Sequence, residues 1–431
     1  MGLLRRVSVC ALTLWSTCVA AEDRPPFPPA TPGWLELSAD YRSRFEGFEG
    51  ARFQPGNDDA YVLSRVRLGA TFVGSPSWRV VFQAQDARVY LKSDQPARPP
   101  FRDIVDARLA YLELGARKDA RWSARIGRQE LAFGEQRLIG NADWLNTGRT
   151  FDAVRTTVRW PRVTVDTFGG YVLRVMPEQL NRPDPGNVLY GVNIVAARVV
   201  PGVTVEPYFF GHRAPNQLQE DGLRDTAHSM TTGARWIATS LGRVDASGEV
   251  AAQFGSIGAD TIRAWASHWT TGFTFAGARG QPRVFGEYNY ASGDDNRHDG
   301  RRQTFDQLYA TGHDKLGLAD QVGWRNIHHV RGGVDVHPSA RVLATARYHS
   351  WWLASATDAL YDASGAAMVA PVDPSGDRHV GQELDVQATL AAPRKVRMAA
   401  GYAHIFPGSL LLRATPGHSF SYPYLSFNVG F

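Results

Sequence analysis

The sequence predicts an all-β fold: a transmembrane antiparallel β-barrel of about 18 strands, with short periplasmic turns and long extracellular loops. Three observations predict it. Apolar and polar residues alternate along segments of roughly ten residues, as in strands with one face in lipid and the other in water. The connections between these segments alternate between short and long. The chain also ends inside an alternating strand, on the free aromatic residue Phe431.

The last strand shows the alternation clearly. One of its faces is apolar and carries Leu425, Phe427, Val429 and Phe431. The other face is polar or small and carries Tyr424, Ser426, Asn428 and Gly430. An edge strand of a soluble β-sandwich can have the same pattern. A barrel, however, must pair its last strand with its first, which removes the exposed sheet edge. We also expect this strand, through Phe431, to be recognised by the barrel assembly machinery.

The N-terminus predicts export from the cytoplasm. Residues 1–21 combine two arginines with an apolar stretch too short to span a membrane, as in a secretory signal peptide. Both cysteines, Cys10 and Cys18, lie in this segment, so the mature chain has no thiol for a disulfide or metal site. Residues 22–431 contain no apolar run of helix-spanning length and no linker-like change of composition. We expect them to form one barrel domain.

The charge balance is mild. The chain has 47 Lys+Arg and 42 Asp+Glu, and removing Arg5 and Arg6 leaves 45 against 42, a net charge of +3. This total does not indicate nucleic-acid binding. Nearly every cation is arginine, which a genome rich in arginine codons explains in part.

The strands can be justified in order. In 34–46, Leu35 and Leu37 alternate with Glu36 and Ser38, and the same alternation recurs in 61–73 and from Trp78 onward. Segment 243–255 alternates cleanly, whereas 105–115, 163–175 and 188–199 are ambiguous about which residues share a face. The remaining predicted strands are 121–128, 151–160, 203–212, 229–239, 261–276, 282–292, 326–337, 341–354, 380–391, 395–406 and 420–431.

The connections indicate which end of the barrel faces out. The short ones are 74–77, 116–120, 161–162, 200–202, 240–242, 277–281, 338–340 and 392–394. The long ones are 47–60, 91–104, 129–150, 176–187, 213–228, 293–325, 355–379 and 407–419, and 256–260 is one short exception. Short periplasmic turns opposite long outer loops are typical of outer-membrane barrels. Aromatic residues near strand ends predict interfacial girdles: Trp34, Trp78, Trp122, Trp160 and Tyr422.

Two polar stretches do not alternate, 127–155 and 293–326. The first reads Gly-Arg-Gln, Gly-Glu-Gln-Arg, Gly-Arg and Phe-Asp-Ala-Val-Arg in succession, and the second contains Thr304-Phe305-Asp306 and Gly323-Trp324-Arg325-Asn326. Their polar density predicts that the loops 129–150 and 293–325 fold into the barrel and narrow it.

These two stretches resemble the alginate export family of outer-membrane porins. Asp59-Ala60-Tyr61, Arg65-Val66-Arg67-Leu68-Gly69 and Gln85-Asp86-Ala87-Arg88 also look like blocks of that family, in the same order. The resemblance implies an eighteen-stranded barrel with an arginine-lined constriction for an acidic polysaccharide such as alginate. In one respect the chain departs from the pattern: the alginate exporter has a long periplasmic turn before its last two strands, and here that turn is only Ala391–Lys395.

Inward-facing arginines predict an anion-selective pore. Arginine keeps its charge and offers forked donors to carboxylates, and rings of cations select anions in pores. Interleaved carboxylates, namely Asp40, Asp86, Asp106, Asp335 and Asp385, are expected to hold the arginines in place. The predicted pore-lining residues are Arg42, Arg65, Arg67, Arg125, Arg128, Arg137, Arg149, Asp152, Arg155, Arg331 and Arg347.

Other interpretations remain open from sequence. The solute can instead be a small organic or inorganic anion, or the lumen can be plugged in a structural or adhesive barrel. His349-Ser350 suggests an outer-membrane hydrolase, although neighbours in a strand face opposite ways. The same objection applies to a metal site at His328-His329. We expect no catalytic residues, cofactor or metal; the expected partners are an anionic solute, outer-membrane lipid and periplasmic export proteins.

Overall fold

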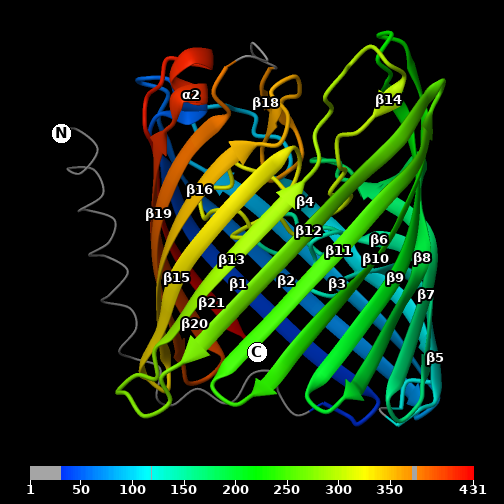
Figure 1. Cartoon of the computed structure of the whole chain (residues 1–431). Coiled ribbons are helices and arrows are strands. Elements are labelled where there is room, and N and C mark those ends of the chain that lie inside the picture. Colours follow the sequence, from blue (N-terminus) through cyan, green and yellow to red (C-terminus); the bar gives the residue numbers. More distant parts are fainter. Residues whose placement is uncertain (1–30, 118, 371–375) are drawn as a thin grey trace.

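A computed structural model describes residues 31–117, 119–370 and 376–431, and the predicted signal peptide lies outside them. In the described residues, eighteen long antiparallel strands form one closed, tilted barrel, so the predicted fold class and strand number are confirmed. Figure 1 shows the short turns gathered at one end and the long loops at the other, with the C-terminus at the short-turn end.

Every predicted strand is present. The strands of the barrel are β1 (Leu35–Phe48), β2 (Asp59–Ser75), β3 (Trp78–Tyr90), β4 (Asp103–Leu114), β5 (Trp122–Gln129), β6 (Phe151–Arg159), β7 (Val163–Arg174), β8 (Arg182–Val200), β9 (Val203–Leu218), β10 (Arg224–Leu241), β11 (Val244–Ile257), β12 (Asp260–Thr274), β13 (Arg283–Ala291), β15 (Ile327–Ser339), β16 (Val342–Leu353), β19 (His379–Ala392), β20 (Val396–Pro407) and β21 (Phe420–Gly430). The loops add β14 (Arg301–Arg302), a hairpin of β17 (Leu360–Tyr361) and β18 (Ala367–Val369), the turn η1 (Ala51–Phe53) and the helix α2 (Ser409–Ala414).

The last strand closes the barrel. β21 pairs with β1 in antiparallel register, with Val429 opposite Tyr41. Its two faces are those expected from the alternation: Leu425 points outward with 54% of its surface exposed, and Tyr424 points inward with 6% exposed. Closure pairs the edges of the sheet, which a strand in hydrocarbon requires because no water is present to satisfy free backbone groups.

The outer face is apolar between two bands of aromatic residues. Trp34, Trp78, Trp122 and Trp160 are exposed at the short-turn end, as the predicted girdle requires. Tyr422 was wrongly assigned to a girdle: it shares the inward face of β21 with Tyr424 and is only 7% exposed. None of the helices in the described part of the chain has the length and hydropathy needed to cross a membrane.

Two predicted loops are shorter than expected. β9 extends to Leu218 and β10 begins at Arg224, so most of the predicted loop 213–228 is a hairpin that rises above the barrel. β8 likewise begins at Arg182, within the predicted loop 176–187. The turn before the last two strands is short, as predicted, since β19 ends at Ala392 and β20 begins at Val396.

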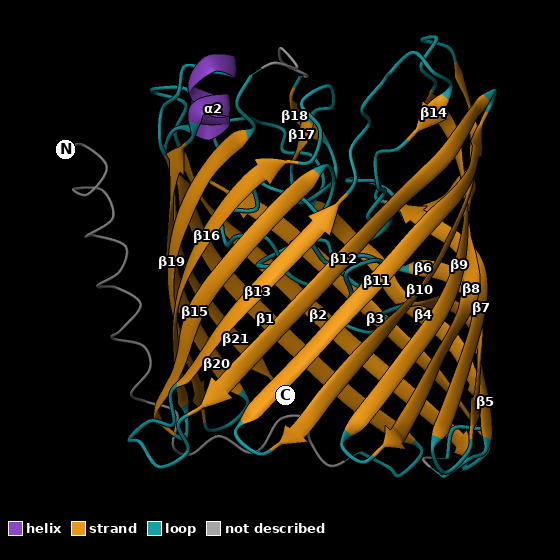
Figure 2. Ribbon diagram, in the orientation of Figure 1, coloured by secondary structure: helices purple, strands orange, loops and turns teal. Residues whose placement is uncertain are grey.

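The two polar stretches fold into the lumen, as expected (Figure 2). The segment after β5 and the segment before β15 meet there through a parallel backbone bridge between Ile139 and Tyr309. Both segments carry buried apolar side chains that pack against the inner wall: Leu131, Phe133, Leu138, Ile139, Phe305, Leu316, Leu318 and Trp324. The lumen therefore contains a hydrophobic core of its own, built from loop residues, inside a polar wall.

Phe305 offers a test of this inner core. The Phe305 side chain is fully buried and packs edge-on against Trp324 at 5.3 Å between ring centres. We expect Phe305→Ala to cost about 3–5 kcal/mol of loop packing and to leave the barrel wall intact. The variant should show faster protease cleavage within 293–326 and a larger single-channel current.

The control is Leu412→Ala, on the exposed side of α2, which should change neither readout. Cleavage of Phe305→Ala at the wild-type rate would show that the inner core does not hold the loop.

Candidate functional site

Five arginines form a cluster on the inner wall of β1, β2 and β4. This cluster, called the arginine cluster below, consists of Arg42, Arg44, Arg65, Arg67 and Arg108, all of them buried. Arg42 and Arg65 are direct cross-strand partners, and like charges in such positions repel each other. The cluster therefore needs acceptors from outside the wall.

The inward loop after β5 supplies those acceptors. Arg42 donates to the backbone carbonyl oxygens of Asp143 at 2.7 Å and Leu145 at 3.1 Å. Arg65 donates to the Asp143 carbonyl at 3.0 Å and lies 3.1 Å from its carboxylate, which Arg67 also contacts at 2.7 Å. Arg44 donates to the Trp144 carbonyl at 2.7 Å. The chain at Asp143–Leu145 is thus held against the wall by four guanidinium groups.

Asp143 is the shared counter-ion of this contact. Burial alone would raise the pKa of the Asp143 carboxyl, but the charges of Arg65, Arg67 and Arg42 outweigh burial and lower it below its usual value. The Asp143 side chain still has 49% of its surface exposed. One ionised carboxylate therefore faces the lumen in front of a buried layer of arginines.

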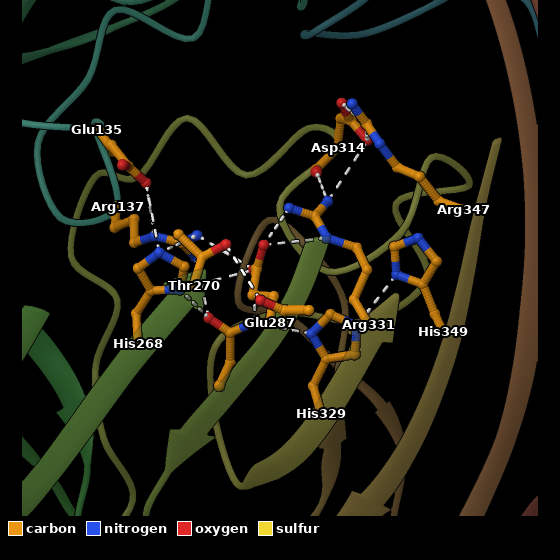
Figure 3. Close-up of polar contacts among 12 residues, drawn as sticks. Glu135, Arg137, His268, Thr270, Glu287, Asp314, His329, Arg331, Arg347 and His349 are labelled. Carbon is orange, nitrogen blue, oxygen red and sulfur yellow. Dashed lines mark hydrogen bonds and ion pairs between the residues drawn. The ribbon is translucent and has the colours of Figure 1, made fainter. Parts of the chain in front are cut away.

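A second network lies on the opposite wall, where Figure 3 shows it between β12 and β16. The Glu287 carboxylate forms ion pairs with Arg331 and with Arg137. Arg137 comes from the inward loop after β5 and lies 3.3 Å from Glu287. Asp314, from the inward loop before β15, forms an ion pair with Arg347 at 2.6 Å. Both inward loops are therefore tied by ion pairs to this wall as well.

The remaining predicted arginines lie apart from these two networks. Arg128 pairs with Asp152 at 2.9 Å, Arg125 with Glu113 at 3.3 Å, and Arg155 with Asp166 at 2.8 Å. Arg149 bonds only to backbone carbonyls, those of Gly140, Tyr309 and Ala310, where it joins the two inward loops. The predicted residues thus form three groups along the lumen and not one ring.

The carboxylates only partly match those predicted. Asp40 lies 3.8 Å from Arg65 and Asp106 lies 3.5 Å from Arg128, whereas Asp385 contacts His349 instead of an arginine. The central acceptors Asp143, Glu287 and Asp314 were not predicted to pair with the arginines, and Arg108 was not predicted to line the pore. Segment 282–292 was predicted as a strand, and the alternation of its residues puts Glu287 and Asn289 on one face. The sequence therefore contained the information needed to predict that Glu287 lines the lumen.

Some cations in the lumen have no carboxylate partner. Within the described residues, the side chains of Arg42 and Arg149 bond only to backbone carbonyls, and the ammonium group of Lys315 makes no hydrogen bond or ion pair. Burial and the charge of Arg137 lower the pKa of the Lys315 ammonium group. These three cations thus lack a direct carboxylate partner in the described part of the lumen.

A hydrogen-bonded chain links the second network to two buried carboxylates. Asn289 accepts from Arg137 through Oδ1, so its Nδ2 donates to Glu287 and to His329 Nδ1, both at 2.8 Å. His329 must then donate through Nε2 to His349 Nδ1, at 3.0 Å. The remaining ring nitrogen, His349 Nε2, carries a hydrogen atom and lies 3.0 Å from Asp385.

These hydrogen bonds determine whether His349 can bind a metal ion. His349, Glu383 and Asp385 are buried, and their potential ligand atoms lie within 4.8 Å of one another. A metal would need the lone pair of His349 Nε2, but the hydrogen bonds place a hydrogen atom there.

The adjacent residues suggested for other chemistry face apart. His349 points into the lumen toward Asp385, whereas Ser350 approaches His379 on the other side of the wall. His329 likewise points inward, and His328 points outward, where Tyr288 contacts it at 2.8 Å. Neither pair brings its two side chains together, so neither forms a nucleophile and base or a two-histidine metal site.

A closed barrel with an apolar exterior, aromatic bands and a charged lumen narrowed by loops defines a porin of the bacterial outer membrane. The family model for alginate export matches residues 33–423, and the chain belongs to that family. A comparison of the sequence with curated proteins found no match.

Solved structures with the same fold include three proteins of Pseudomonas aeruginosa, of which OpdK is described as an outer membrane protein. OpdO has a TM-score of 0.59 and 14% identity, with 92% of this chain and 97% of that chain covered. OpdQ has a TM-score of 0.61 and 9% identity, over 92% and 97% of the two chains. OpdK has a TM-score of 0.59 and 10% identity, over 92% and 98%. At such identities the likeness extends to the fold alone.

Asp143 offers a direct test of charge in the lumen. We expect Asp143→Asn to raise the anion-to-cation permeability ratio about twofold or more, because it removes an exposed negative charge in front of three arginines. The reversal potential under a salt gradient measures this ratio. Asp119→Asn, in an exposed turn beside Arg117, is the control and should have no effect. An unchanged reversal potential in Asp143→Asn would exclude Asp143 from the conducting path.

Glu135 offers a test by pH. Burial opposes its ionisation, but the charges of Arg137, His268 and Arg235 prevail and lower the pKa of Glu135 to about 2. A lowered pKa stabilises the folded state above the ordinary pKa of about 4.5, and this stabilisation is lost as the pH falls toward 2. Wild type should therefore exceed Glu135→Gln in free energy of unfolding by a constant amount above pH 5, and by less and less between pH 4.5 and 2. A difference that did not depend on pH would contradict this assignment.

Proposed function

We propose that the protein is an anion-selective channel that passes an acidic polysaccharide such as alginate along its arginine-rich lumen. The observation that carries this proposal is the arginine cluster, in which Arg65 and Arg67 share the carboxylate of Asp143 and Arg42 bonds only to backbone carbonyl oxygens of the same loop. Fixed positive charge in a narrow channel with low-dielectric walls raises the local concentration of anions.

The mechanism is diffusion past fixed charges, with no covalent step. A uronate carboxylate entering the lumen meets arginines that already have backbone and carboxylate acceptors. Such arginines attract the anion without binding it tightly, and conduction requires that balance between entry and release. The half-exposed Asp143 moderates binding further, and Lys315 offers an ammonium group without a fixed partner. Membership of the alginate export family supports a polyuronate as the solute.

A small organic or inorganic anion is the second candidate. The packed inner core around Phe305 and Leu318 favours it, because that core occupies lumen space that a polymer would need. One similar structure, OpdK, was determined with vanillate, a small organic carboxylate. If the solute is a polymer delivered from inside the cell, periplasmic export proteins are the partners we expect at the short-turn end.

The test is single-channel recording in a planar bilayer under a salt gradient, with alginate or a neutral polysaccharide added. We expect an anion-selective current that alginate blocks and the neutral polymer does not. Arg65→Gln with Arg67→Gln should reduce the anion preference, and Arg128→Ala or Arg155→Ala should reduce it less, because each loses only one paired charge.

Arg117→Gln, in an exposed periplasmic turn, is the control and should behave as wild type. Anion selectivity without alginate block would support the small-anion alternative. A cation-selective current, or none from the intact barrel, would overturn the proposal.

A further inference from the structure

The outward face of the barrel carries a continuous row of rings near its extracellular rim. Trp265 on β12 contacts Tyr290 on β13 at 4.3 Å between ring centres, and Tyr290 contacts His328 on β15 at 4.9 Å. His328 is the cross-strand partner of Trp352 on β16, which contacts His379 at 5.4 Å. The five strands are neighbours in the barrel wall (Figure 1). The rings therefore form one row near the extracellular ends of these strands, the level at which aromatic residues of such barrels meet lipid headgroups.

Two arginines lie just beyond this row on the extracellular side. Arg263 is on the same outward face of β12 as Trp265, two residues closer to the rim, and it makes no hydrogen bond or ion pair with any described residue. Arg378, immediately before β19, is exposed and donates only to the backbone carbonyl of Ala354, at 2.7 Å. Both guanidinium groups are therefore available to an anion at the membrane surface.

Two adjoining hollows connect the arginines to the rings. One, of about 510 Å³, is lined by Arg263, Trp265, Tyr290 and Arg378. The other, of about 620 Å³, is lined by Tyr288, His328, Val330, Trp352 and again Arg378. The second hollow continues down the lipid-facing wall, where Tyr288 and Val330 are exposed. Together they form a polar, cationic upper part and an apolar lower part.

The acidic residues nearby do not cancel this charge. Asp377, in the second hollow, already accepts hydrogen bonds from the Ser409 hydroxyl at 2.5 Å and the His379 amide at 3.0 Å. Asp295 lines the first hollow, together with the two arginines Arg263 and Arg378. Arg413 donates to the backbone carbonyl oxygen of Asp377 at 2.7 Å. Three arginines, Arg263, Arg378 and Arg413, therefore face the two carboxylates around the hollows, and an anion meets a net positive surface.

We propose that these two hollows form a binding site for a phosphorylated glycolipid of the outer leaflet. Its phosphate would lie between Arg263 and Arg378, its sugar would stack on Trp265 and Tyr290, and an acyl chain would run over Tyr288 and Val330. Arginine binds phosphate in a bidentate manner, and basic groups next to a membrane surface attract anionic lipid. Placing the rings between the arginines and the apolar wall suits a headgroup with a tail, which a free anion does not need.

The test uses the full barrel purified in detergent and native mass spectrometry. The probes are bisphosphorylated lipid A, its phosphate-free form and inorganic phosphate. We expect lipid A to bind wild type, with an affinity about fivefold lower in Arg263→Gln and about 20-fold lower in Arg263→Gln with Arg378→Gln. Arg263 has no partner in the described residues, so its replacement should not affect folding, and migration of the unheated barrel on a gel checks this.

The control is Arg224→Gln, because Arg224 is also exposed at the extracellular end of a strand and bonds only to a backbone carbonyl, that of Asn216. It should bind lipid A as wild type does. The proposal is overturned if the double variant keeps wild-type affinity, if the phosphate-free lipid binds equally well, or if inorganic phosphate alone displaces lipid A. None of these outcomes depends on whether the lumen is anion-selective.

Discussion

The contact between four arginines of the wall, Arg42, Arg44, Arg65 and Arg67, and the loop segment Asp143–Leu145 is the interaction on which the rest of the lumen depends. Arg42, Arg65 and Arg67 lie on neighbouring strands whose register sets Arg42 opposite Arg65, where like charges repel each other. The wall itself offers them only Asp40, at 3.8 Å from Arg65, and the Gln85 amide, which accepts from Arg67. The loop brings backbone carbonyl oxygens and the Asp143 carboxylate to that wall. The same contact therefore stabilises buried cations and holds the loop inside the barrel.

The two inward loops depend on each other as well as on the wall. Arg149 donates to carbonyls on both loops, and the bridge between Ile139 and Tyr309 joins their backbones. Across the lumen, Arg137 reaches Glu287 and Arg347 reaches Asp314. The loops are thus tied to opposite walls by charge and to each other by backbone, with apolar side chains filling the space between them.

The fold could be predicted from the sequence because lipid imposes a period of two on every strand and closure imposes an even count. The site could not be predicted to the same extent. Arg108 lies in 105–115, whose faces were ambiguous, and the pairing of β3 with β4 contains two register shifts and a left-handed Val105 that move side chains between faces. Asp143 and Asp314 lie in loops, where no period tells which way a side chain points. Tyr422 was misplaced because a position near a strand end does not determine the face.

The turn between Ala392 and Val396 is too short to enter the lumen, so restriction of the lumen depends on the inward loops. A barrel of this width needs some element to restrict its lumen, and here no long periplasmic turn is present before the last two strands. The elements that fill the lumen enter from the extracellular end and are fixed by charged groups on the wall, not by covalent links. Charge–charge contacts in a wet lumen weaken as salt rises, whereas the apolar contacts around Phe305 and Leu318 do not. The ion pairs therefore set the position of the loops, and the inner core sets how strongly they remain there.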